Sequence, residues 1–100
     1  MDRSAFHRLF KSPGPVVTPV IHVTDLRQTL TNIGHAVRLG VPGIFLINHD
    51  FPVAPFLPIL HAVRVECPDV WLGVNFLAQP GRVAFPILGR LAAGGCQIDA

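Results

Sequence analysis

The stretch GIFLINHD, residues 43–50, decides the fold class of this chain. Residues 43–47 form an unbroken apolar run, which is typical of a parallel strand covered on both faces. Polar residues begin abruptly at Asn48, so polarity is confined to the carboxyl end of the run. We therefore expect residues 43–47 to be one strand of a parallel sheet.

The sequence before this strand carries one complete strand-and-helix pattern. A β-branched run at residues 16–23 predicts a strand that starts near Pro19. Asp25 and Gln28 resemble a capping box, and Gly40 is expected to end the helix that they begin. Its expected orientation places Leu26, Leu30, Ile33 and Val37 on the sheet and Arg27, Thr31 and Arg38 in solvent.

The pattern repeats after residue 50. Apolar residues over 56–63 predict a second helix, which Cys67 and Pro68 close. Pro55 and Pro58 are compatible with this helix only in its first turn, because a proline has no N–H to donate to the preceding turn.

A third unit follows. Residues 70–74 predict a strand that ends in Asn75, and residues 83–91 predict a helix with Pro86 early in it and a glycine pair after it. Residues 96–99 are expected to begin a fourth strand.

Polar strand ends recur at the spacing of one β/α unit, at His22, Asn48, Asn75 and Asp99. Parallel strands joined by single helices cross over right-handed, which leaves a closed barrel or an open doubly wound sheet. We expect an α/β fold of parallel β/α units, the amino-terminal part of a (β/α)8 TIM barrel, over residues 15–100, after a basic segment at residues 1–14. About three and a half units fit in the chain, against roughly 250 residues for a whole barrel, so we interpret it as truncated.

Composition excludes several classes of protein. The chain is 50% hydrophobic and 14% charged, against about 25% charged in an average soluble domain, which excludes disorder. No apolar run reaches the roughly 18 residues of a membrane span. The net charge of +2 is scattered, which argues against nucleic acid as a partner. No secretory signal is visible, so a cytoplasmic location is expected.

Three stretches together resemble one family. IHV at 21–23, LINHDFPVAPF at 46–56 and LGVNFL at 72–77 are similar to the BtpA family of TIM-barrel proteins, in the expected order and spacing. The resemblance implies a barrel related in fold to phosphate-binding barrels such as phosphoribosylanthranilate isomerase; the founding member is associated with photosystem I stability, with no settled chemistry. Where the family tends to carry an acidic residue and Asn after its second strand, this chain has NHD at 48–50.

Ligands of both candidate architectures bind beyond the carboxyl ends of the strands. Because imidazole titrates near neutral pH, His22 or His49 is a candidate general base. Asp50 or Asp99 is a candidate to orient that base or to act as the acid. Asn48 and Asn75 are candidate ligand-binding residues. The alternative is that all six satisfy loop backbone groups and cap helices.

Other reactive residues receive no role. No HxH or HExxH spacing supports a metal, so none is expected, and the cofactor is left open. His35 and His61 fall inside helices, where an outward position is the ordinary interpretation. Cys67 and Cys96 are interpreted as reduced thiols at the amino-terminal ends of the strands, opposite the candidate site.

Three functions stay open. The first is an enzyme-type barrel that binds a small polar, phosphorylated or nucleoside-like metabolite. The second is a non-catalytic assembly or stability factor. The third is a small open α/β module that pairs with another chain. Because an unclosed barrel leaves two sheet edges unpaired, we expect the chain to self-associate. Residues 1–11 are expected to cover an edge rather than bind a membrane surface.

Overall fold

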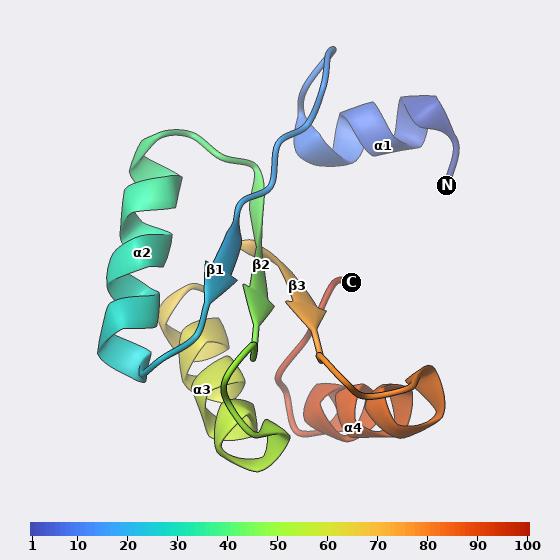
Figure 1. Cartoon of the computed structure of the whole chain (residues 1–100). Helices are drawn as coiled ribbons and strands as arrows, with labels where there is room; N and C mark the ends of the chain where they lie inside the picture. The colour runs from blue at the N-terminus through green and yellow to red at the C-terminus, as the bar shows by residue number, and fades with distance from the viewer.

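The computed structural model describes all residues, 1–100, as four helices and three strands. In chain order these are α1 (Arg3–Phe10), β1 (Val20–His22), α2 (Leu26–Arg38), β2 (Gly43–Ile47), α3 (Val53–Glu66), β3 (Trp71–Asn75) and α4 (Gly81–Ala93). Strands and helices alternate from β1 onward (Figure 1). The expected order of elements is therefore confirmed, and the bounds of β2 are those expected from its unbroken apolar run.

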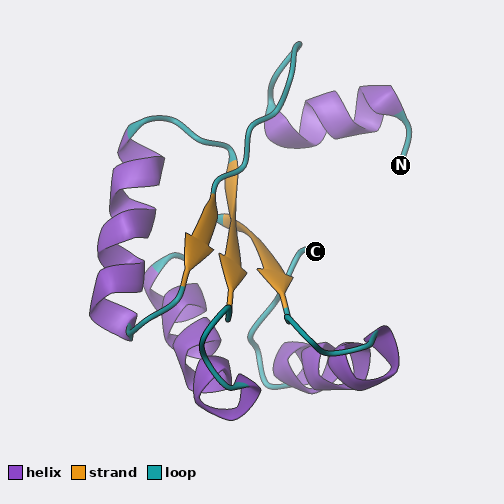
Figure 2. Ribbon diagram, in the orientation of Figure 1, coloured by secondary structure: helices purple, strands orange, loops and turns teal.

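The three strands form one parallel sheet in the order β1-β2-β3. His22, Ile47 and Asn75 stand in one row of the register, so the three carboxyl ends are level with one another. The arrows in Figure 2 all point the same way. The fold is thus α/β with parallel β/α units, and its three strands lie side by side in chain order.

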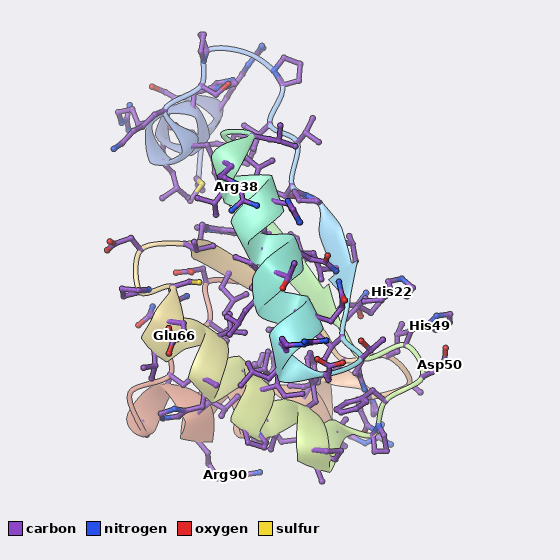
Figure 3. All side chains as sticks on the ribbon, turned by 90° about the vertical axis from the view of Figure 1, so that its left-hand side faces the viewer. His22, Arg38, His49, Asp50, Glu66 and Arg90 are labelled. Carbon is purple, nitrogen blue, oxygen red and sulfur yellow. The ribbon has the colours of Figure 1, made fainter.

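One face of the sheet, the covered face, carries the core. Its residues are Ile21, Ile44, Leu46, Leu72 and Val74. Helices α2 and α3 pack on this side, and Figure 3 shows them on one side of the strands. Phe56, Leu60 and Val63 of α3 are fully buried there. Burying side chains of this size stabilises the fold by about 1.5–3 kcal/mol each, so the core holds the sheet to its helices.

The other face of the sheet, the open face, carries Val20, His22, Phe45, Ile47 and Trp71. No strand or helix covers most of it, and Val20 is 55% exposed. At its amino-terminal end, the ring of Phe10 from α1 lies 5.2 Å from that of Trp71, which lies 5.5 Å from that of Phe45. Phe10 therefore covers one end of this face, whereas residues 1–11 were expected to cover an edge of the sheet.

Gly73 lies under the Phe45 ring on the open face. A Cβ at this position would lie 2.3 Å from the ring, closer than atoms can approach. Glycine is therefore required here so that Phe45 can cross β3 and reach Trp71.

Helix α2 begins as expected, and Leu26, Leu30 and Ile33 pack against the core as predicted. The Asp25 carboxylate accepts a hydrogen bond of 2.8 Å from the Gln28 N–H, which caps the helix. The expectation that Val37 packs on the sheet is wrong, because this residue is 46% exposed. The buried arc is rotated toward Thr29, which is fully buried with its hydroxyl donating to the Asp25 carbonyl.

Two prolines depart from their expected positions. Pro55 lies in the first turn of α3, but Pro58 and Pro86 lie inside α3 and α4. A proline inside a helix leaves the carbonyl four residues earlier without its donor. These carbonyls belong to Ala54 and Arg82, both of which are exposed residues. Exposure of both prolines is why the helices continue through them.

The expectation that residues 96–99 begin a fourth strand is wrong. Residues 96–100 form no helix or strand, although the Asp99 N–H donates to the Leu72 carbonyl and the Val74 N–H to the Ala100 carbonyl, each over 2.8 Å. The C-terminal segment therefore runs along the outer edge of β3 and occupies it without extending the sheet.

Candidate functional site

Four exposed polar side chains gather at the carboxyl ends of the strands, and we call this group the strand-end surface. It consists of His22, His49, Asp50 and Asn75. His22 and Asn75 are the last residues of β1 and β3, and His49 and Asp50 lie in the loop that follows β2. The parallel register brings these positions to one end of the sheet, as the sequence predicts.

The two imidazoles of this surface lie together. The ring centroids of His22 and His49 are 5.2 Å apart, with the ring planes at 82°, an edge-to-face arrangement. The Asp50 carboxylate lies 4.0 Å from Nδ1 of His49. Figure 3 shows the three side chains projecting from the same end of the molecule. Because His49 and Asp50 are 56% and 96% exposed, water screens their attraction.

Asn48 is buried next to the strand-end surface and holds its loops in place. Its side chain is buried, with 4% of the residue exposed. Its Nδ2 donates to the Phe51 carbonyl over 2.9 Å, and its Oδ1 accepts from the Leu77 N–H over 2.9 Å. The amide thus ties the loop after β2 to the loop after β3. Asn48 therefore positions the loop that carries His49 and Asp50. Its Oδ1 already accepts a hydrogen bond from the Leu77 N–H.

Asp99 is not part of the strand-end surface, so the expectation that it joins the other candidates there is wrong. Its Oδ2 accepts from the Leu72 N–H over 2.8 Å and lies 3.0 Å from Nη2 of Arg64. Leu72 is the second residue of β3, near the opposite end of the sheet. The displacement follows from residues 96–100, which lie along β3 instead of continuing into a strand with its own carboxyl end.

Arg64 is the residue that the sequence did not single out. Its guanidinium donates to the carbonyls of Cys67, Pro68, Val70 and Gln97 and to the Asp99 carboxylate, at 2.8–3.4 Å. The side chain is 12% exposed. The one sequence signal was its place in the last turn of a helix, where arginine commonly binds terminal carbonyls. Its role in holding residues 97–99 depends on a contact across more than thirty residues, which no local pattern predicts.

One of the surface cavities lies at the amino-terminal end of the sheet, away from the strand-end surface. This cavity of about 400 Å³ is lined by Phe10, Lys11, Trp71, Arg64 and Asp99, among others. None of the cavities includes His22, His49, Asp50 or Asn75. The strand-end surface is therefore open and shallow in this chain, because only three strands contribute to its wall.

Both cysteines are free thiols. Burial raises the pKa of both, and the positive charge of Arg64 opposes this increase only in part. Cys67 follows α3 and its carbonyl accepts from the Val70 N–H, so it lies at the amino-terminal ends of the strands, as expected. A raised pKa keeps a thiol protonated and weakly nucleophilic, which argues against a catalytic role.

No three His, Cys, Asp or Glu side chains converge as metal ligands. None of the helices has the length and hydropathy of a membrane-crossing segment. No protein-family model, curated protein or solved structure matches the chain.

Proposed function

We propose that this chain belongs to a (β/α)8-barrel protein of the BtpA type that binds a small polar or phosphorylated metabolite at the carboxyl ends of its strands. The observation that carries the proposal is the pair of imidazoles, His22 and His49, held 5.2 Å apart at the end of adjacent parallel strands. Each comes from a different β/α unit, and the amide of Asn48 ties the loop that carries His49 to the loop after β3.

The chemistry of this surface suits an anionic or hydroxyl-rich ligand. Two imidazoles supply N–H groups that can donate to phosphate or hydroxyl oxygens. Asn75 is exposed at the end of β3 and adds an amide that both donates and accepts. Asp50 is the residue that would hold an imidazole proton in place, through its contact with His49. The order β1-β2-β3 is the one that the first three units of a barrel have.

Histidine-ring NMR signals test this proposal, because the chain contains five histidines and only two lie on the strand-end surface. We expect His22 and His49 to shift together when ribose 5-phosphate or adenosine monophosphate is added, while His7, His35 and His61 stay in place. Inorganic phosphate serves as the control for simple charge.

A His49→Ala variant should abolish the shift of His22, and the matched variant His61→Ala, at an exposed position of α3, should leave it unchanged. Equal shifts of all five rings, or no shift with either metabolite, would contradict the proposal.

A second candidate is a β/α module that works by pairing with another chain, as an assembly factor does. The observation that favours it is the open face, where Val20 is 55% exposed and Phe45, Ile47 and Trp71 are only partly buried. Contiguous apolar surface of this kind commonly marks an interaction site. Sedimentation of the chain across a concentration series tests this candidate, because pairing raises the sedimenting mass.

A further inference from the structure

The two edges of the sheet are not equivalent. At the outer edge of β3, the Leu72 N–H donates to the Asp99 carboxylate and the Leu72 carbonyl accepts from the Asp99 N–H, each over 2.8 Å. The Val74 N–H donates to the carbonyl of Ala100. Arg64 holds this segment in place through Gln97 and Asp99. The chain therefore covers its own β3 edge.

The outer edge of β1 has no such cover. The Pro19 carbonyl accepts from Phe45 and the Val23 N–H donates to Ile47, so the odd-numbered residues face β2. The alternate residues Thr18, Val20 and His22 then point their N–H and C=O groups outward, and no hydrogen bond joins them to the rest of the chain. We call these outward groups the β1 edge.

The β1 edge is short, since β1 has three residues, but it lacks the charged side chains that protect many free edges. Natural edge strands carry charged side chains, prolines or bulges that prevent pairing with other chains. Residues 12–24 contain no Asp, Glu, Lys or Arg. Pro19 does not block the edge, because its backbone faces β2. In Figure 3, which looks from the β1 side, β1 stands beside α2 and is not hidden by it.

We propose that the β1 edge binds the β1 edge of a second copy of this chain, antiparallel about a twofold axis at Val20, which joins the two sheets into one. Val20 then lies opposite Val20 of the second copy, and Thr18 lies opposite its His22. Each outward N–H and C=O of these residues finds a partner in this register. Two identical uncharged segments meet without like charges, which is why the second copy suits this edge better than a charged peptide.

The proposal deepens the pairing function and rests on it; His22 belongs to the β1 edge through its backbone and to the strand-end surface through its side chain. Sedimentation velocity of the full chain over a concentration series should show a monomer–dimer equilibrium. Val20→Lys should weaken dimerisation by at least about tenfold, because two lysines would lie directly opposite each other. Val65→Lys is the matched control, since Val65 is 64% exposed on α3 and should leave dimerisation unchanged.

Amide hydrogen exchange identifies the edge. Raising the concentration should slow exchange at Val20 and His22, whose N–H groups are free in the monomer. A chain that stays monomeric at every concentration would overturn both this proposal and the pairing function. Dimerisation that survives Val20→Lys, or protection that appears elsewhere while Val20 and His22 exchange freely, would overturn the β1 edge alone and leave the pairing function standing.

Discussion

Arg64 holds residues 97–99 against the sheet through a single guanidinium group. Four backbone carbonyls and one carboxylate accept its hydrogen bonds, so all three nitrogens of the guanidinium donate. Asn48 has the same character at the other end of the sheet, where its amide joins two loops. Sequence reasoning found Asn48 because it follows a strand, but not Arg64, whose acceptors come together only in the folded chain.

Replacing Arg64 should therefore lower stability more than replacing an exposed arginine. Arg64→Met leaves several carbonyls and the Asp99 carboxylate without a donor, and we expect a loss of about 2–4 kcal/mol in the free energy of unfolding. Urea denaturation measures it. Arg90→Met in α4 is the control, since Arg90 is exposed and forms no side-chain hydrogen bond in the chain. Equal stability of the two variants would show that the Arg64 contacts contribute nothing.

At the scale of elements, the sequence predicted the helices and strands well where burial alone decides them. The bounds of β2 follow from its apolar run, and α2 begins at its Asp25 cap as expected. Where the predictions failed, the tertiary structure decided the outcome and the local sequence did not. Pro58 is tolerated inside α3 because solvent covers that side of the helix, and the last residues form no strand because they lie on β3.

The rotation of α2 gives a direct comparison between two of its residues. Ile33 is 1% exposed, and Ile33→Ala should cost about 2–5 kcal/mol through lost burial and a residual cavity. Val37→Ala, one turn later on an exposed surface, should change stability by less than about 0.5 kcal/mol. Thermal or urea denaturation of the two variants measures the loss in free energy of unfolding for each. A cost at Val37 as large as that at Ile33 would show that Val37 belongs to the buried face, as the spacing of apolar residues predicted.

At the scale of the whole molecule, the sheet is asymmetric in two ways. Its covered face holds the core while its open face is bare except where Phe10 reaches Trp71, and its β3 edge is capped while its β1 edge is free. Polar residues collect at the carboxyl ends of the strands because the parallel register requires it. The sequence predicted this collection for His22, His49, Asp50 and Asn75. It failed for Asp99, since no local signal indicates where a segment without a strand will lie.

The proposed site depends most on the position of His22 beside His49. This position requires β1 and β2 to be parallel in the stated register. Nuclear Overhauser contacts between the two imidazole rings measure it directly in solution. We predict a cross-peak between ring protons of His22 and His49, together with contacts between Val20 and Phe45 across the sheet. Contacts from the His22 ring to Pro42 or Trp71, at the opposite end of the strands, would contradict the account.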